Sequence, residues 1–321
     1  MNIVLLSGGI GKRLWPLSNP KCPKQYLKIL TKEKNQLESM LQRTWRQLKE
    51  NQLDYKSIIV TNEMQIDLLK SQISEDAQVI TEPENRDTFA AIALASMHFF
   101  SNTDANKDTV ITILPVDSYV DKVFFQTVKR LEEILISSNS NLALIGAKPK
   151  WPSEKYGYIV PEKSSSDHLY FHVSHFKEKP SINEARKLLE KQSYWNCGVF
   201  SFKLSFIISM LEDLKLPTSY DALLNRYHNI PRTSFDYMVV ERTKNIICVP
   251  YDGMWKDLGT WESLAEDITE YSNSENISIN ACENTHIINN LDVPLTVNGI
   301  DDAVVVATHQ GILVTSKKEN S

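Results

Sequence analysis

The chain has 321 residues and a formal net charge of −5, with acidic and basic residues mixed along its length. This length has room for about two domains of ordinary size. The mixed charge presents no broad basic field, so we expect no nucleic-acid partner. No apolar run approaches the ~20 residues that span a bilayer, so we expect no membrane partner either.

The four cysteines, at positions 22, 197, 248 and 282, are scattered and form no C-x-x-C pair. This pattern argues against a zinc ribbon and against a disulfide framework. Reduced thiols are typical of the cytoplasm, which is therefore the expected location.

The chain opens with a short apolar run that breaks into a glycine-rich turn. Ile3–Leu6 is typical of a strand buried on both faces of a parallel sheet. After Ser7, the glycines Gly8, Gly9 and Gly11 predict a backbone turn with positive φ angles. Because they lack a Cβ, they also let backbone amides approach phosphate oxygens. The sequence therefore predicts a phosphate-binding loop after the first strand.

Two common glycine-rich loops do not fit this segment. The dinucleotide fingerprint G-x-G-x-x-G would need a third glycine where Leu14 stands, and no Gly-Lys-Ser or Gly-Lys-Thr occurs. Arg13 and Lys24 add cationic side chains to the same stretch. The loop thus differs from those of dinucleotide-binding proteins and P-loop NTPases.

Further along, apolar runs alternate with helical stretches. Predicted strands are Ile58–Thr61, Val79–Thr81, Val110–Pro115 and Leu142–Gly146, and predicted helices are Gln36–Glu50, Met64–Ile73, Thr88–Phe100 and Phe124–Ser137. This βαβ rhythm predicts an α/β fold with a Rossmann-like, mostly parallel sheet. Ligands of such sheets bind at the carboxyl ends of the strands.

The second half of the chain is expected to hold a hairpin, a further helix and a β-rich extension. The predicted elements are a hairpin or β extension over Tyr156–Phe176 with its turn at Ser164–Asp167, a helix over Asn183–Lys191, and short strands at Val304–Ala307 and Ile312–Thr315. From about Asn273, helical periodicity fades and Asn and Asp mark repeated turns. We predict a boundary near Glu270, with a main domain over residues 1–270 and an extension over 271–321.

The N-terminal string SGGIGKRLWPLS and the PKQY motif at Pro23–Tyr26 resemble the signature of sugar-nucleotide pyrophosphorylases, in particular mannose-1-phosphate guanylyltransferases. Further blocks follow in that family's order: EPENRDTFAAIALAS from Glu82, ILPVDSYV from Ile113, KYGYI from Lys155, FKEKP from Phe176, WNCGVF from Trp195, SFDYMVVE from Ser234 and WKDLGTW from Trp255. The C-terminal VNGIDDAVVVATHQGILV resembles the family's partial β-helix-like extension, which is associated with subunit contacts. The resemblance therefore implies a nucleotidyltransferase domain, this extension and a homodimer.

The resemblance implies an enzyme of nucleotide-sugar biosynthesis, serving polysaccharide synthesis, that makes GDP-mannose and pyrophosphate from GTP and mannose 1-phosphate with Mg²⁺. Such a reaction brings an anionic nucleophile to an anionic phosphorus, so charge neutralisation and positioning carry the catalysis. The implied catalytic residues are Arg13, Lys24, Asp117 and Asp257, and the two aspartates are the implied Mg²⁺ ligands. Arg13 would neutralise the departing pyrophosphate, and Lys24 would contact the α-phosphate.

The resemblance also implies two sets of binding residues. Those for the nucleotide are Ser7, Gly8, Gly9, Gly11, Lys12, Arg13, Glu82, Arg86, Asp87 and Asp117. Those for the sugar phosphate are Gly157, Glu178, Lys179, Asn196 and Asp236.

Several of these residues have a simpler structural interpretation. Asp117 could cap the helix that follows it, and Asp257 could serve a local turn. Glu178 and Lys179 could be an exposed charge run, and Asn196 could belong to a turn. The sequence alone leaves these alternatives open.

The chain departs from the family pattern, mainly on the nucleotide side. Asp87 and Phe89 stand where the family commonly has Asn and Ala, Ser118 stands where it has His, and Cys197 replaces the usual Ser. An ionised Asp87 could still accept the guanine N1 and N2 protons. Another base, and another sugar 1-phosphate such as a heptose or modified hexose, stay open. A catalytically impaired homologue that binds nucleotide-sugar and regulates a partner enzyme is a further alternative, against which the implied catalytic residues argue.

Overall fold

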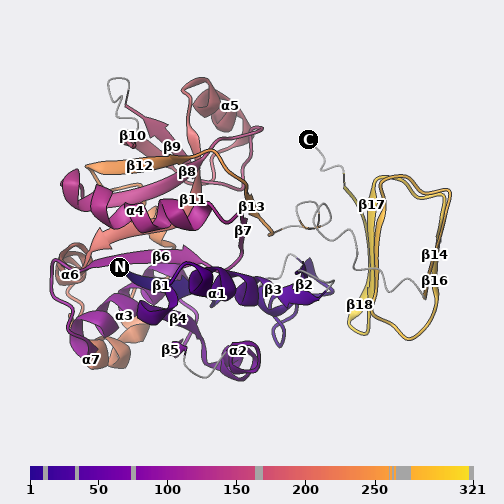
Figure 1. Ribbon diagram of the computed structural model, residues 1–321, viewed down its shortest axis with the longest axis horizontal. Coiled ribbons are helices and arrows are strands. Elements are labelled where there is room, and N and C mark those ends of the chain that lie inside the picture. The colour runs from indigo at the N-terminus through magenta and orange to yellow at the C-terminus, as the bar shows by residue number, and fades with distance from the viewer. Residues whose placement is uncertain are drawn as a thin grey trace.

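A nine-stranded sheet in the order β5-β4-β1-β6-β11-β8-β12-β10-β9 forms the centre of the main domain (Figure 1). Its strands are β1 (Asn2–Leu6), β4 (Ser57–Asn62), β5 (Gln78–Glu82), β6 (Val110–Pro115), β8 (Leu142–Ala147), β9 (Tyr158–Pro161), β10 (Phe171–Lys177), β11 (Tyr194–Lys203) and β12 (Ile246–Tyr251). Two small sheets pair β2 (Lys28–Thr31) with β3 (Leu37–Ser39) and β7 (Ser118–Val120) with β13 (Trp255–Asp257). The computed structural model describes residues 1–9, 14–32, 36–73, 77–162, 169–259, 261, 264 and 276–317.

Most strands of the central sheet point the same way. The pairs β1–β4, β1–β6, β4–β5 and β8–β12 are parallel, and within this sheet only β10 and β11 run against the others. The prediction of a Rossmann-like, mostly parallel sheet is therefore confirmed. The βαβ pattern did not predict β11. Because β11 is antiparallel to β6 and β8, its first residues lie at the edge where those two strands end.

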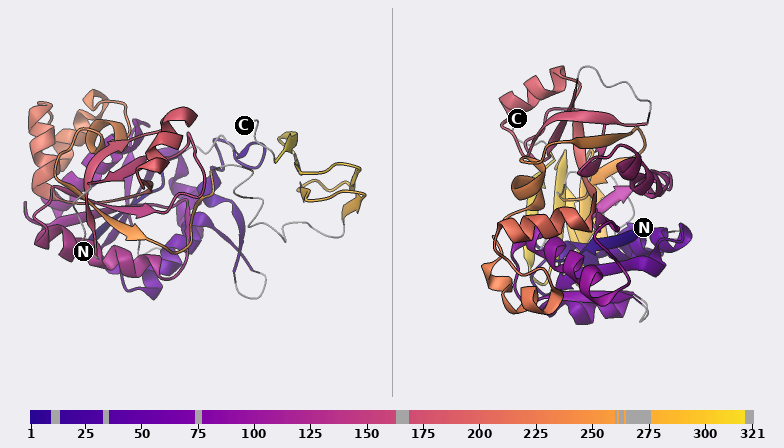
Figure 2. Two further views of the ribbon diagram at one scale, coloured as in Figure 1. Left: turned by 90° about the horizontal axis from the view of Figure 1, so that it is seen from above. Right: turned by 90° about the vertical axis from the view of Figure 1, so that its left-hand side faces the viewer.

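Helices cover both faces of the sheet (Figures 1 and 2). Those on one face are α1 (Met40–Glu50), α2 (Ile66–Gln72) and α4 (Phe124–Ser137), and those on the other are α3 (Asp87–Asn102), α6 (Leu204–Asp213) and α7 (Tyr220–Asn225). α5 (Ile182–Glu190) packs beside β9. Because α3 is apolar on nearly every side, it is buried between the sheet and its neighbouring helices.

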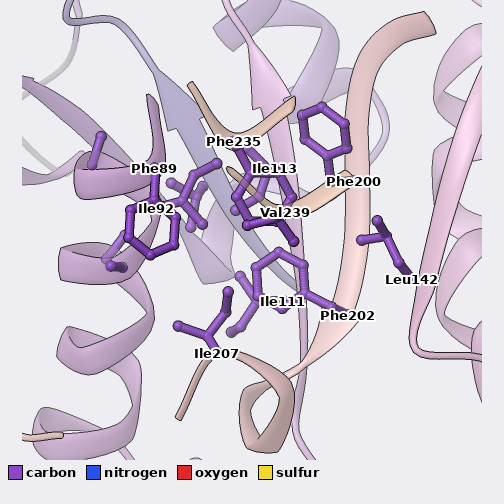
Figure 3. Packing of buried hydrophobic residues seen from close by; sticks show 14 of the residues in the cluster. Phe89, Ile92, Ile111, Ile113, Leu142, Phe200, Phe202, Ile207, Phe235 and Val239 are labelled. Carbon is purple, nitrogen blue, oxygen red and sulfur yellow. The ribbon is translucent and has the colours of Figure 1, made fainter. Parts of the chain in front are cut away.

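The core around α3 joins two segments that carry predicted site residues (Figure 3). Phe89 follows Asp87, Phe235 precedes Asp236, and both phenylalanines are fully buried. The ring centroid of Phe235 lies 5.0 Å from that of Phe200 on β11. Burying a side chain of this size stabilises the fold by about 1.5–3 kcal/mol. The backbone beside both predicted site residues is therefore firmly held.

The helix predicted over Gln36–Glu50 begins later than expected. It starts at Met40, because Ser39 forms a capping box with Gln42, and the residues just before it belong to β3. The prediction was therefore wrong for this first turn, although the capping box was visible in the sequence.

The remaining predicted elements agree with the structure to within a few residues. The helix predicted over Met64–Ile73 opens with a 3-10 turn over Glu63–Gln65 and continues as α2. The predicted hairpin is confirmed, because β9 and β10 are antiparallel neighbours. Its predicted turn, Ser164–Asp167, lies outside the described residues.

The described part of the C-terminal extension consists of short strands packed against the main domain (Figure 1). They are β14 (Ile277–Asn280), β15 (His286–Asn289), β16 (Leu295–Asn298), β17 (Ala303–Thr308) and β18 (Gly311–Ser316). β14 pairs with β16 and β15 with β17 in parallel, and β18 is an antiparallel edge strand. An apolar cluster joins Ile288, Val304 and Val306 to Leu30 and Met40. The β-rich extension is confirmed, whereas the boundary near Glu270 lies outside the described residues and stays a prediction.

Two expectations from composition can be compared with the structure. No helix in the described part of the chain has the length and apolar character needed to cross a membrane. All four cysteines are free thiols. Cys197 and Cys248 are buried, and burial raises the pKa of both thiols.

Candidate active site

The predicted site residues gather at the edge of the sheet where the parallel strands end. Parallel pairing brings Glu82, at the end of β5, and Pro115, at the end of β6, to the same edge as the loop after Leu6. The antiparallel pair β7–β13 sets Asp257 opposite Ser118 and thus beside Asp117. The sequence prediction of a shared crevice at this edge therefore agrees with the topology.

Asp117 and Asp257 converge on the ammonium group of Lys24. The Nζ atom lies 2.7 Å from Oδ2 of Asp117 and 3.7 Å from Oδ1 of Asp257. The Lys24 side chain is 14% exposed, whereas the aspartates are 34% and 33% exposed. Two carboxylates therefore share one positive charge at an accessible place on the sheet edge.

Helix α1 fixes the turn that carries Asp117. The hydroxyl of Thr44 donates to the carbonyl oxygen of Val116 at 3.2 Å. Side-chain nitrogens of Arg43 and Gln47 both donate to the carbonyl oxygen of Val120 at 3.2 Å. The backbone on either side of Asp117 is thus tied to a buried helix.

The helix-cap alternative for Asp117 does not hold. The side chain that receives the first amides of α4 is that of Asp121, whose Oδ1 accepts from the backbone of Val123 at 2.8 Å and of Phe124 at 3.2 Å. Asp257 lies in strand β13 and pairs with Lys24.

The chemistry of this carboxylate pair fits Mg²⁺. The two carboxylates already converge on one cation, and Mg²⁺ typically takes one or two protein carboxylates together with phosphate oxygens and water. No group of three or more metal-binding side chains occurs among the described residues. Gly259 adds room, because a Cβ there would lie 3.0 Å from both carboxylate oxygens of Asp257. The pair therefore suits a cation bound jointly with a phosphate-bearing ligand.

The glycine-rich loop differs from its prediction in backbone conformation. Neither Gly8 nor Gly9 has a positive φ angle, so that part of the prediction was wrong. Gly8 is required for another reason, because a Cβ would lie 2.8 Å from Oε2 of Glu82. At Gly9 a Cβ would meet no atom of the described residues within 4 Å. Close approach, rather than a left-handed backbone, explains the first glycine.

Gln25 supports this loop from the protein interior. Its Nε2 donates to the carbonyl oxygens of Ser7 and Gly9, each at 2.8 Å. Ser7 is buried, and its hydroxyl donates to the Tyr26 hydroxyl at 3.2 Å. The predicted nucleotide-binding residues that lie outside the described part of the chain are Gly11, Lys12 and Arg13.

Glu82 is a buried carboxyl at the end of β5. The Tyr227 hydroxyl donates to Oε1 of Glu82 in a short hydrogen bond. Burial raises the pKa of Glu82 to about 7, and the nearby charge of Asp87 contributes to the rise, while the Tyr227 hydrogen bond opposes it. A buried carboxyl against a glycine-rich loop is typical of a functional site.

Arg86 and Asp87 have structural contacts in the same region. Arg86 donates through Nε to the carbonyl oxygen of Ile230 at 2.7 Å. Asp87 is exposed, has a φ of 69°, and its Oδ1 accepts from the backbone of Thr88 at 2.7 Å. Asp87 therefore stabilises the start of α3.

Hydrogen bonds join three of the predicted sugar-binding residues, Gly157, Asn196 and Asp236, and Glu178 lies beside them. The amide of Asn196 donates through Nδ2 to Oδ1 of Asp236 at 2.8 Å, and its backbone nitrogen donates to the carbonyl oxygen of Gly157 at 2.8 Å. A Cβ on Gly157 would lie 2.6 Å from Oε2 of Glu178. Gly157, Glu178, Asn196 and Asp236 are thus together, although they come from four separate segments.

Glu178 is not part of a solvated charge run, because its side chain is only 7% exposed. Lys179 pairs with it at 2.9 Å and has a φ of 43°. The carboxylate of Glu241 accepts from the backbone nitrogen of Glu178 at 2.9 Å and fixes this turn. Burial, followed by the charge of Glu178, raises the pKa of Asp236 above its ordinary value.

Sequence reasoning missed three residues that organise the site: Gln25, Tyr227 and Glu241. Gln25 and Glu241 lie inside the quoted blocks PKQY and SFDYMVVE, so those blocks carried a usable signal. Tyr227 lies in no motif that we identified.

Comparisons with known proteins agree with this architecture. Residues 2–274 match the family described as nucleotidyl transferase, and the chain belongs to that family. It is 32% identical to mannose-1-phosphate guanylyltransferase of Escherichia coli, over 98% of this chain and 72% of that protein. It is 29% identical to the xanthan biosynthesis protein XanB of Xanthomonas campestris, over 97% of this chain and 69% of that protein. The chain is thus an enzyme related to mannose-1-phosphate guanylyltransferases.

A solved structure supports the fold. It is described as mannose-1-phosphate geranyltransferase from Thermus thermophilus, and it superposes with a TM-score of 0.79 at 23% identity. The match covers 98% of this chain and 95% of that one, so it includes both the main domain and the extension.

Proposed function

We propose that the protein converts GTP and mannose 1-phosphate to GDP-mannose and pyrophosphate with Mg²⁺. The observation that carries this proposal is the convergence of Asp117 and Asp257 on Lys24, beside the loop after β1. The hydrogen-bonded group of Asn196 and Asp236 supplies the polar contacts that a sugar needs.

Each catalytic residue has a separate role in the reaction. Lys24 neutralises the α-phosphate, and Arg13 neutralises the departing pyrophosphate, so that negative charge is stabilised as it shifts. Asp117 and Asp257 would hold Mg²⁺, which supplies further charge neutralisation at the phosphates when bound. No covalent protein intermediate is required, because the sugar phosphate is itself the nucleophile.

The sugar-side residues position that nucleophile. Glu178, Asn196 and Asp236 are poised to hydrogen-bond sugar hydroxyls, and Gly157 lets the backbone approach the ring. Lys179, held beside Glu178, contacts the sugar phosphate and aligns it for in-line attack.

On the nucleotide side, the loop at Gly8 and Gly9 approaches the phosphates, and Glu82 accepts from the base. Above about pH 7, where Glu82 has lost its proton, its carboxylate accepts hydrogen bonds and cannot donate them, so it favours guanine over adenine. This supports GTP over ATP as the nucleotide.

A panel of substrates tests the proposal. Pyrophosphate release is measured with GTP, ATP, UTP and dTTP against mannose 1-phosphate, glucose 1-phosphate and a heptose 1-phosphate, with and without Mg²⁺. We expect the highest kcat/KM for GTP with mannose 1-phosphate. Preference for another pair would correct the substrates, and no release with any pair would favour a regulatory nucleotide-sugar-binding protein.

We also propose a homodimer formed through the extension. Ile312 and Val314 point to the same side of the edge strand β18 and are 61% and 57% exposed, which suits a second copy of the chain. Light scattering at micromolar concentration should give the dimer mass for the native chain and the monomer mass for Ile312→Lys. Val293→Lys, at an equally exposed position in the extension but outside β18, is the control and should stay dimeric. A monomeric native chain would refute the dimer.

A further inference from the structure

Tyr227 and Glu82 form a buried pair whose members are distant in the sequence. Tyr227 lies in a 3-10 turn, is 1% exposed, and donates its hydroxyl hydrogen to Oε1 of Glu82. The other carboxylate oxygen, Oε2, lies against Gly8, at 2.8 Å from where a Cβ would be. One oxygen is therefore engaged by the protein, and the other lies beside the loop that we assign to the nucleotide.

Further hydrogen bonds join the segment that carries Glu82 to the segment that carries Tyr227. They run from Arg86 Nε to Ile230 O at 2.7 Å, from Phe89 N to Thr233 O at 3.3 Å, and from Phe235 N to Thr88 Oγ1 at 2.8 Å. Because the two segments are also joined by the buried ring of Phe235, Tyr227 has little freedom to move. Its hydroxyl therefore holds the Glu82 carboxylate in one orientation.

We propose that Tyr227 is a positioning residue that determines base specificity, by fixing Glu82 as an acceptor for the ring N–H of a guanine-type purine. This inference rests on the proposed nucleotide role of Glu82. Guanine and hypoxanthine carry hydrogen on N1, whereas the N1 of adenine is an acceptor that a fixed carboxylate repels. Asp87 is less suited to this task, because it is exposed and its carboxylate already accepts from Thr88.

The variant Tyr227→Phe removes the hydroxyl and keeps the buried ring. We expect the ratio of kcat/KM for GTP to that for ATP to fall about 10-fold, mainly through the KM for GTP. The KM for the sugar 1-phosphate should not change. Calorimetric titration of GTP and ATP measures the same ratio without turnover.

Tyr251→Phe is the matched control. Tyr251 is also a buried tyrosine whose hydroxyl donates to a carboxylate, Oδ1 of Asp121, at 2.6 Å. Its removal should lower thermal stability and leave the GTP-to-ATP ratio unchanged. A purely structural Tyr227 would behave like this control, and that result would overturn the proposal.

A pair of variants with Glu82→Gln gives a second test, which also applies if Tyr227→Phe folds poorly. With Tyr227 donating to the new amide oxygen, the amide NH₂ group would face the base and oppose the guanine N–H donors. We expect Glu82→Gln to lower kcat/KM for GTP about 100-fold. Adding Tyr227→Phe frees the amide to turn its oxygen to the base. The double variant should therefore have a kcat/KM for GTP about 10-fold higher than that of Glu82→Gln alone. If the losses in kcat/KM for GTP from the two single substitutions simply add in the double variant, the proposal is overturned.

The native enzyme separates this inference from the function on which it rests. If the native chain uses GTP and ATP equally, the guanine assignment fails, and the role of Tyr227 fails with it. If the native chain prefers GTP and Tyr227→Phe keeps that preference, the proposed function stands and only the role of Tyr227 is refuted.

Discussion

Replacing Gly8 by alanine should destabilise the protein, whereas the same change at Gly9 should not. A methyl group on Gly8 would lie 2.8 Å from Oε2 of Glu82, which is closer than carbon and oxygen normally approach. The carboxylate cannot move aside easily, because it is 5% exposed and Tyr227 holds its other oxygen. Overpacking of this kind costs about 1–3 kcal/mol. Neither glycine has a positive φ, so alanine introduces no backbone strain at either position.

Thermal unfolding of the two variants measures this difference. Gly8→Ala should lower the Tm by about 2–4 °C for each kcal/mol lost. Gly9→Ala, where a Cβ meets no atom of the described residues within 4 Å, should be neutral or gain about 0.4–1 kcal/mol from the stiffer unfolded chain. Gly8→Ala should also raise the KM for the nucleotide by displacing Glu82. Equal stability of the two variants would refute the close packing of Gly8 against Glu82.

Three other predictions test the site. Asp117→Ala and Asp257→Ala should each lower kcat about 100-fold or more and weaken the Mg²⁺ dependence, with the fold unchanged by circular dichroism; near-normal turnover at limiting Mg²⁺ would exclude the metal role. Glu241→Ala, which removes the acceptor of the Glu178 backbone nitrogen, should raise the KM for the sugar 1-phosphate about 10-fold by loosening the turn at Glu178, while the KM for GTP, the internal control, stays constant. Between about pH 4.5 and 7 the unfolded chain has lost the Glu82 proton and the folded chain retains it, so the free energy of unfolding should fall as pH rises, by up to about 3 kcal/mol. Denaturant titrations at both pH values should show a smaller loss in Glu82→Gln than in the native chain, because Asp236, whose pKa burial also raises, contributes equally in both proteins.

Local patterns predicted most of the fold. The alternation of apolar runs and helical stretches located β4, β5, β6 and β8 and the helices between them. This was possible because apolar residues recur at a different spacing in strands than in helices. β11 was missed because it is an antiparallel insertion between parallel strands, and no local pattern marks that placement.

The candidate site was predictable where its residues belong to motifs. Asp117, Asp257 and Lys24 came from family blocks, and the structure brings all three together. Their shared ion pair was not predictable, because it depends on the pairing of β7 with β13. The contact between Tyr227 and Glu82 joins positions 145 residues apart, and nothing near either residue in the sequence indicates the other.

The contacts between the extension and the N-terminal part of the chain indicate which part of the fold is completed last. Trp261 donates through Nε1 to the carbonyl oxygen of Trp15 at 3.2 Å, and a Cβ on Gly311 would lie 2.7 Å from the Trp15 ring. Thr308 reaches the carbonyl oxygen of Pro16, 292 residues away along the chain. Contacts of such long range form late, and synthesis proceeds from the N-terminus. Trp15 and Pro16 therefore leave the ribosome early, yet complete their packing only after β17 and β18 have emerged.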